Sequence, residues 1–326
     1  MALEDKTRPA TKPDHIYREI EGLRLSYYIP DKSLRSALAY KPKPSDVFIV
    51  SYPKCGTTWM QYLLFNIFSG GVPPKDRAEF RLKTPFLECT GVECLAMMPG
   101  PGAIKTHLPF HKQPYSREAK YFYITRNPYD CCVSDYHHTK ILPAYFFEDG
   151  TFEEFFDMFV EGKGEYGDYF DHLLSWYEHR GDPNVFFLTY EDLKKDTKSW
   201  IVKMADFIGR EYGERVRSDP DLVELILQMS SVERMKKVFN VAAPKTSPHD
   251  AALCPKDESE KSTRTFEEFM EYMVKKSMTG DFVRRGVVGD WRNYFSQNQI
   301  KRMKERIALK TAGSDVMTLW KDVDHP

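Results

Sequence analysis

The chain has 326 residues, of which 41% are hydrophobic and 29% are charged, a balance typical of a folded globular protein. Its formal net charge is -1, whereas a protein that binds bulk nucleic acid usually carries a strong basic excess. No segment approaches the roughly 20 apolar residues of a membrane span, and residues 1–14 lack the apolar run of a signal peptide. We therefore expect a cytoplasmic protein that binds neither nucleic acid nor membranes, with a flexible arm (residues 1–15) before one folded domain (residues 16–326).

The first predicted strand covers residues 47–50, four β-favouring residues that follow a proline-rich turn. Polar residues 51–58 come next, and apolar residues then recur at helical spacing from Trp59 until Gly70 and Gly71 end the pattern. This order of strand, loop and helix resembles that of a phosphate-binding P-loop.

Further strands are predicted at residues 121–124 and 185–188, with a short apolar piece at residues 103–107. Helices are expected at residues 129–140, 197–208, 219–228 and 297–309. The alternation predicts an α/β fold, a single domain with a central, mostly parallel sheet flanked by helices. Polar residues 244–265 form a predicted loop, either a surface linker or a lid over the site.

Four polar clusters follow the apparent strand ends, which is where α/β sheets bind their ligands. In the first cluster, Gly56 would let the backbone approach an oxyanion, Lys54 adds positive charge, and Thr57 and Thr58 add hydroxyl donors. The lysine precedes the glycine, so this is not a Walker A loop, and a capped helix start is the alternative. The other clusters are Lys105 with His107, Arg126 with Ser134, and Tyr190.

Residues 52–59 read Y-P-K-C-G-T-T-W and resemble the Y-P-K-S-G-T-T-W phosphosulfate loop of the cytosolic sulfotransferases. Four more segments resemble motifs of that family in the same order: K-T-H-L-P (105–109), R-N-P through serine (126–134), Y-E-D-L (190–193), and R-R-G with G-D-W (284–291). The resemblance covers most of the chain. It implies transfer of a sulfuryl group from PAPS (3′-phosphoadenosine-5′-phosphosulfate) to the hydroxyl of a small acceptor, with PAP as the desulfated product.

The resemblance also implies a role for each motif residue. The loop of Lys54, Cys55, Gly56, Thr57 and Thr58 would hold the 5′-phosphosulfate, and Lys54 would offset charge on the leaving oxygen. Arginine grips phosphate bidentately, which suits the 3′-phosphate. That phosphate would be bound by Arg126, Ser134, Arg284, Arg285 and Gly286, and the adenine by Trp59 and Tyr190, with Ser230, Ser231 and Phe282 as further candidates.

His107 would be the general base that takes the proton of the acceptor hydroxyl during in-line attack, with Lys105 close to the transferred group. The scheme needs no metal. Cys131, Cys132, His137 and His138 are close in sequence, but they lack the paired C-x-x-C spacing of a zinc site.

The acceptor is expected to be a phenol, because the chain offers many aromatic residues for a flat pocket. Candidates for its walls, which could equally be core residues, are Phe80, Phe86, Tyr136, Tyr145, Phe146 and Phe147. Glu148 and Asp149 would suit an amine-bearing, catecholamine-like acceptor.

The chain departs from the family pattern at Cys55, which replaces a serine. A thiol at a helix start beside Lys54 is either a near-isosteric replacement or a reactive, oxidant-sensitive group. Cys131 and Cys132 are expected to be buried packing residues. The segment that mediates dimers in many family members is altered here (residues 292–301), so we expect a monomer or a weak homodimer.

Two other functions stay open at this point. A P-loop kinase-like enzyme would share the strand–loop–helix start, although the sequence lacks Gly-Lys-Thr and clear Mg²⁺ carboxylates. A catalytically idle PAP-binding protein would share the site, although Lys54 and His107 are both present.

Overall fold

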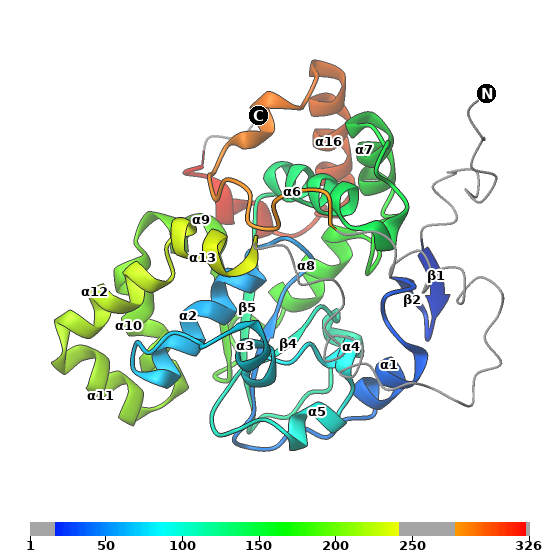
Figure 1. The fold of residues 1–326 in the computed structure, drawn as a ribbon. Coiled ribbons are helices and arrows are strands. Elements are labelled where there is room, and N and C mark those ends of the chain that lie inside the picture. The colour runs from blue at the N-terminus through cyan, green and yellow to red at the C-terminus, as the bar shows by residue number, and fades with distance from the viewer. Residues whose placement is uncertain (1–16, 241–277, 324–326) are drawn as a thin grey trace, which may run out of the picture.

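A computed structural model describes residues 17–240 and 278–323 of the chain (Figure 1). The predicted arm (residues 1–15) and the predicted loop (residues 244–265) both lie outside these ranges. Four strands form the central sheet, in the order β4 (Ile104–Thr106), β3 (Val47–Val50), β5 (Lys120–Thr125) and β6 (Val185–Thr189). All three pairings are parallel, so the prediction of an α/β fold with a parallel sheet is confirmed.

Alternate residues of β3 and β5 face two separate hydrophobic cores, as a strand period of two requires. Phe48 and Tyr121 belong to one core, whereas Ile49 and Phe122 belong to the other. Both faces of the sheet are therefore covered, which explains why these strands read as continuous apolar runs.

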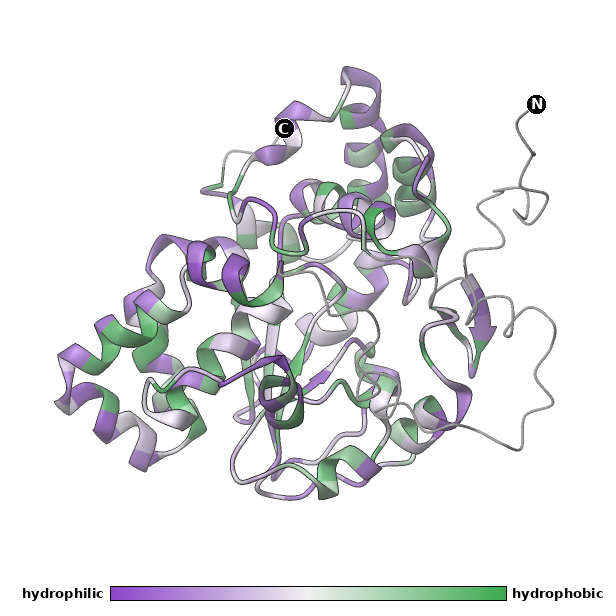
Figure 2. Cartoon of the chain, viewed as in Figure 1, coloured by the Kyte–Doolittle hydropathy of each residue, from purple (hydrophilic) through white to green (hydrophobic). Residues whose placement is uncertain are grey.

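Helices cover the two faces in two groups (Figure 1). The group on the Ile49 face comprises α2 (Thr57–Ser69), α10 (Thr197–Ile208), α11 (Arg210–Ser218) and α12 (Pro220–Met229). The group on the Phe48 face comprises α6 (Pro128–Ile141), α7 (Phe152–Val160), α8 (Tyr169–Tyr177) and α16 (Gln297–Lys310). The outer helices carry hydrophobic and hydrophilic residues side by side along their length (Figure 2), as helices with one buried stripe do.

The four predicted helices agree with α6, α10, α12 and α16 to within one residue at each end. The strand–loop–helix prediction is also confirmed, because β3 leads into α2 and Gly70 caps that helix in a left-handed conformation.

Several elements were not predicted from the sequence, and most of them are short. A separate antiparallel hairpin joins β1 (Tyr17–Ile20) and β2 (Leu23–Ser26) through a turn at Glu21 and Gly22, both with positive φ. The unpredicted helices are α1 (Asp31–Leu38), α3 (Arg77–Lys83), α4 (Leu87–Thr90), α5 (Glu93–Ala96), α7, α8, α9 (Tyr190–Lys195), α11 and α13 (Val232–Phe239).

Candidate active site

The loop between β3 and α2 has the backbone geometry of an anion cradle. Gly56 is the N-cap of α2 with a φ of 107°, and no side chain caps the helix, so its first N–H groups are open to a ligand. A Cβ atom at Gly56 would lie 2.8 Å from Tyr190 Cδ2 and 3.1 Å from Ile124 Cδ1. Lys54 also has a positive φ, 66°, which turns the chain sharply before the helix.

The R-N-P segment is fixed by hydrogen bonds that tie three distant motifs together. Asn127 caps α6, and its side-chain amide donates to Glu191 Oε1 at 2.7 Å, while Trp320 Nε1 donates to Glu191 Oε2 at 2.9 Å. The buried Asp130 carboxylate accepts the backbone N–H groups of Gly289 (2.7 Å) and Trp291 (3.0 Å). Its role is structural: it anchors the C-terminal loop against α6.

The same loop is joined to Arg126, which follows β5. Arg126 donates from Nη2 to the carbonyl of Val287 at 2.8 Å, and its guanidinium lies 4.4 Å from the centre of the Tyr190 ring. Arg284 and Arg285 form ion pairs with Asp290 at 2.5 Å and 2.7 Å. Four cationic and aromatic motif residues are thus gathered at one place from three parts of the sequence.

His107, directly after β4, is buried and held by hydrogen bonds on three sides. Its backbone N–H donates to Glu88 Oε1 at 2.6 Å, and its carbonyl accepts from His172 Nε2 at 3.0 Å. His107 Nδ1 lies 2.7 Å from the Ser51 carbonyl oxygen, which can only accept, so Nδ1 carries the proton and Nε2 has the free lone pair. Burial, and next the charge of Lys105, lowers the pKa of His107 well below 6.5.

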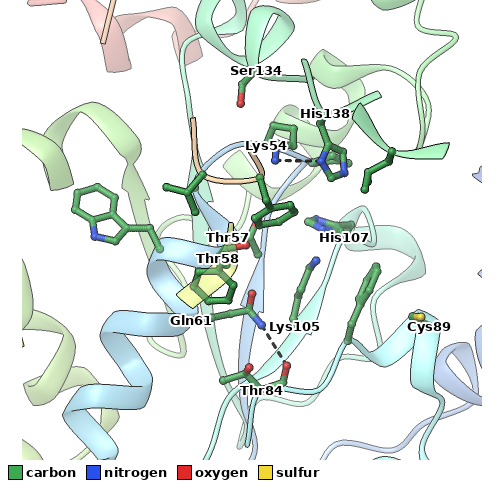
Figure 3. A pocket seen from close by; sticks show the side chains of 18 of the residues that line it. Lys54, Thr57, Thr58, Gln61, Thr84, Cys89, Lys105, His107, Ser134 and His138 are labelled. Carbon is green, nitrogen blue, oxygen red and sulfur yellow. Dashed lines mark hydrogen bonds between the residues drawn. The ribbon is translucent and has the colours of Figure 1, made fainter. Parts of the chain in front are cut away.

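Two lysines lie beside this histidine. Lys54 Nζ lies 3.3 Å from His138 Nδ1 and 4.6 Å from the centre of the Phe282 ring. Burial lowers its pKa to about 8. Lys105 Nζ lies 4.0 Å from the centre of the Phe86 ring, and burial lowers its pKa as well. Figure 3 shows Lys54, which follows β3, and Lys105 and His107, at the end of β4, converging on one space.

That space is a cavity of about 470 Å³, which most of the sequence-predicted site residues line. These are Lys54, Gly56, Thr57, Thr58, Trp59, Lys105, His107, Arg126, Ser134, Tyr190, Phe282, Arg284, Arg285 and Gly286. Ser230 and Ser231 instead line a neighbouring cavity that shares Trp59, Tyr190 and Gly286 with the first. Cys55 lines neither, because its side chain is fully buried behind the loop.

The aromatic and acidic wall residues were predicted only in part. Phe80, Phe86 and Tyr145 line the cavity, whereas Tyr136, Phe146, Phe147, Glu148 and Asp149 are not among its lining residues. Two carboxylate residues line the cavity instead, Glu165 and Asp281, and neither was predicted from the sequence. Glu165 is held by hydrogen bonds to the surrounding side chains. It accepts hydrogen bonds from Tyr145 (2.7 Å), the Ser26 hydroxyl (2.5 Å) and the Ser26 backbone N–H (3.1 Å).

The four residues considered for a zinc site have separate partners. Cys131 Sγ lies 3.6 Å from Cys55 Sγ, Cys132 is buried in the core, and His137 Nε2 lies 2.8 Å from the Tyr294 hydroxyl. Both cysteines are fully buried, as predicted. Within residues 17–240 and 278–323, no three His, Cys, Asp or Glu side chains are arranged to hold a metal ion. Over the same ranges, no helix is both long and apolar enough to cross a membrane.

Comparisons with known proteins identify the family of this chain. The sequence model described as "Sulfotransferase domain" matches residues 44–315. Sulfotransferase 1C2 of Oryctolagus cuniculus is 33% identical over 92% of this chain and 94% of its own. Sulfotransferase 1E1 of Cavia porcellus is 33% identical over 79% of this chain and 80% of its own.

Solved structures show the same fold. Mouse sulfotransferase SULT7A1 complexed with PAP has a TM-score of 0.68 and 27% sequence identity, covering 94% of this chain and 98% of its own. Retinol dehydratase in complex with androsterone and PAP has a TM-score of 0.70 at 21% identity, and covers 94% of this chain and 96% of its own. The family match decides against the kinase-like and idle alternatives: this chain belongs to the sulfotransferase family and is a PAPS-dependent sulfotransferase.

Proposed function

We propose that this enzyme transfers the sulfuryl group of PAPS to the hydroxyl of a small phenol, with His107 as the general base. The observation that carries this proposal is the hydrogen bond from His107 Nδ1 to the Ser51 carbonyl, 2.7 Å long. It leaves the Nε2 lone pair free on a residue that lines the same cavity as Lys54 and Lys105. The lowered pKa keeps the imidazole neutral near pH 7, which is the form that can accept a proton.

The residues proposed to bind PAPS, the sulfuryl donor, suit a polyanionic nucleotide. The open N–H groups of α2 and the Cβ-free position at Gly56 fit the 5′-phosphosulfate. For the 3′-phosphate, Arg126 Nε is buried with no partner among the described residues, and the Ser134 hydroxyl makes no hydrogen bond within them. Trp59 and Tyr190 have their rings 5.4 Å apart at the second cavity, where they would contact the adenine with Ser230 and Ser231.

PAPS supplies the activated sulfuryl group, and the side chains supply the proton transfer and the charge. His107 Nε2 would take the proton of the acceptor hydroxyl as its oxygen attacks. Lys54, with a pKa of about 8, and Lys105 would offset negative charge that develops around the transferred group. Such preorganised charges act more strongly beside buried groups such as His107 than they would in open water.

The cavity wall supports an aromatic acceptor and includes the carboxylate of Glu165. Phe86 lies edge-on to His107, with ring centres 5.3 Å apart, and both line the cavity, so an aromatic surface stands beside the base. Glu165 lines the same cavity, within reach of a cationic group on the acceptor. A phenol with an amine-bearing side chain, as in catecholamines, is therefore the second candidate acceptor, with Glu165 in the role first assigned to Glu148 and Asp149.

The test is sulfuryl transfer from labelled PAPS to a panel of phenols, catecholamines and steroids in the presence of EDTA. Wild-type protein should transfer to at least one phenol, and His107→Ala should lower kcat by about 100- to 10,000-fold. His179→Ala is the matched control, because His179 stacks on Phe110 outside the cavity. Transfer that survives in His107→Ala would rule out His107 as the base, and loss in the presence of EDTA would contradict the metal-free scheme.

A further inference from the structure

His138 lies on α6, one turn after Ser134, and its side chain enters the active-site cavity. Its Nδ1 atom lies 3.3 Å from Lys54 Nζ, the contact drawn as a dashed line in Figure 3. The two residues are 84 positions apart in the sequence. His138 is not one of the motif residues described above, and it has no part in the contacts proposed for PAPS.

The chemistry of the two groups decides the direction of this hydrogen bond. An ammonium group can only donate, so His138 Nδ1 must accept and its proton must reside on Nε2. Burial, and next the positive charge of Lys54, lowers the pKa of His138 well below 6.5. The imidazole is therefore neutral near pH 7, which is the form with a lone pair on Nδ1.

Lys54 has few other contacts that could hold it in place. No carboxylate oxygen of the described residues lies within 4.0 Å of its Nζ. The Phe282 ring, 4.6 Å away, attracts the cation but does not fix its direction. Asp135, Lys105 and Arg126 act on Lys54 through their charges only. A lysine side chain has four flexible carbons, so a single directional hydrogen bond decides where its charge resides.

We propose that His138 is a positioning residue. By accepting a hydrogen bond from the Lys54 ammonium through Nδ1, it holds this charge in the part of the cavity wall that includes His107. This inference rests on the proposed role of Lys54 in sulfuryl transfer. His138 itself moves no proton. Its effect should appear in kcat, because Lys54 acts on charge that develops during the reaction, and only weakly in the KM of the acceptor.

The test compares His138→Phe with His138→Asn. Phenylalanine keeps a flat ring but cannot accept, whereas the Oδ1 atom of asparagine can stand in for Nδ1. A hydrogen bond to a charged group has an effect of about 10- to 100-fold, so kcat should fall by that factor in His138→Phe with the acceptor KM within about two-fold. His138→Asn should recover most of the loss. An equal loss in both variants would overturn the proposal.

His137→Phe is the matched control, because His137 is the neighbouring histidine on α6 and its Nε2 contacts Tyr294 instead of Lys54. It should lose less activity than His138→Phe. A Lys54→Met background separates this proposal from the proposed function. If Lys54→Met alone keeps wild-type kcat, the role of Lys54 fails. Suppose instead that Lys54→Met is slow, and that adding His138→Phe to it lowers kcat by the same factor as His138→Phe does alone. His138 then acts independently of Lys54, and the positioning role fails.

A readout on folded protein covers the case in which the phenylalanine variant does not fold. In ¹⁵N-histidine-labelled wild-type protein, His138 should show an unprotonated Nδ1 and a protonated Nε2 at pH 7.5. The Nδ1 signal should shift in Lys54→Met, which removes the donor. A protonated Nδ1 in the wild type, or a signal that ignores Lys54→Met, would refute the hydrogen bond.

Discussion

Glu88 Oε1 accepts the backbone N–H of His107 at 2.6 Å, while Glu88 Oε2 is buried with no hydrogen-bond partner among the described residues. One carboxylate therefore anchors the backbone of the proposed base and is poorly solvated itself. Burial raises the pKa of Glu88 to about 7, from an ordinary value of 4.5. Between about pH 4.5 and pH 7, Glu88 is therefore protonated in the folded protein but ionised in the unfolded chain.

We expect Glu88→Gln to change how stability depends on pH. In the wild type, Glu88 should lower the free energy of unfolding by up to about 3 kcal/mol as the pH rises from 4.5 to 7. The glutamine can still accept the His107 N–H, but it does not titrate. Urea unfolding should therefore show that the free energy of unfolding of the variant, relative to that of the wild type, is higher at pH 8 than at pH 5. The exposed Glu93→Gln is the control, and an equal pH response in all three proteins would contradict the raised pKa.

The rate should depend on pH through Lys54 and His107. Lys54 has a pKa lowered to about 8, so kcat/KM for PAPS should fall above about pH 8 as free enzyme loses this charge. The acid limb should lie below pH 6.5, because the pKa of His107 is lowered. Lys54→Arg keeps its charge, so its alkaline limb should move to higher pH, whatever its absolute rate. An alkaline limb that does not move would mean that Lys54 is not the group that titrates.

Gly56→Ala should abolish tight nucleotide binding. The backbone φ of residue 56 is 107°, which is unfavourable for any residue with a side chain, and the alanine Cβ would lie 2.8 Å from Tyr190 Cδ2. The loop or Tyr190 must then move, and both belong to the proposed nucleotide site. We expect PAP to bind at least about 10-fold more weakly, measured by calorimetry. Gly181→Ala is the control, since nothing lies within 4 Å of a Cβ there. Unchanged PAP affinity in Gly56→Ala would exclude this loop as the phosphosulfate cradle.

Cys55 should respond slowly to thiol oxidants, because it is fully buried with its Sγ atom 3.6 Å from Cys131 Sγ. Oxidation of the phosphosulfate loop should inhibit the enzyme, and bound PAP should slow the inhibition further by keeping the loop closed. Residual activity followed over time in hydrogen peroxide measures this. Cys55→Ser should resist, and a variant that stays equally sensitive would direct attention to Cys89 and Cys94, which line the cavity.

Glu165→Gln should discriminate between neutral and cationic acceptors. The substitution keeps the size of the side chain and an oxygen for Ser26, but it removes the negative charge of Glu165 from the cavity wall. We expect the KM for tyramine to rise by about 10-fold, while the KM for 4-ethylphenol, its neutral analogue, stays within about two-fold. Steady-state kinetics with this pair isolates the charge. A parallel rise for both acceptors would show that Glu165 only supports the cavity wall through Tyr145 and Ser26.

The sequence alone determined the parts of this protein that depend on local pattern. The apolar runs of β3, β5 and β6 identify buried strands, and each is followed at once by its polar motif. Carboxyl ends of parallel strands meet at one edge of a sheet, so Lys54, His107 and Arg126 could be expected to lie together. The apolar periods of α10, α12 and α16, and the proline that begins α6, are equally local, and the ends of these helices agree with the prediction to within one residue.

Only the tertiary structure decided which atoms face one another across long sequence separations. The β1–β2 hairpin brings Ser26 to Glu165, and the packing of α6 above β3 brings His138 to Lys54. The sharp turn at Lys54 and Gly56 directs Cys55 into the core, whereas the sequence had left open whether this thiol is a near-isosteric replacement or a reactive group. These contacts depend on strand register, helix rotation and burial, which are properties of the whole packed chain and have no signature in any short window of sequence.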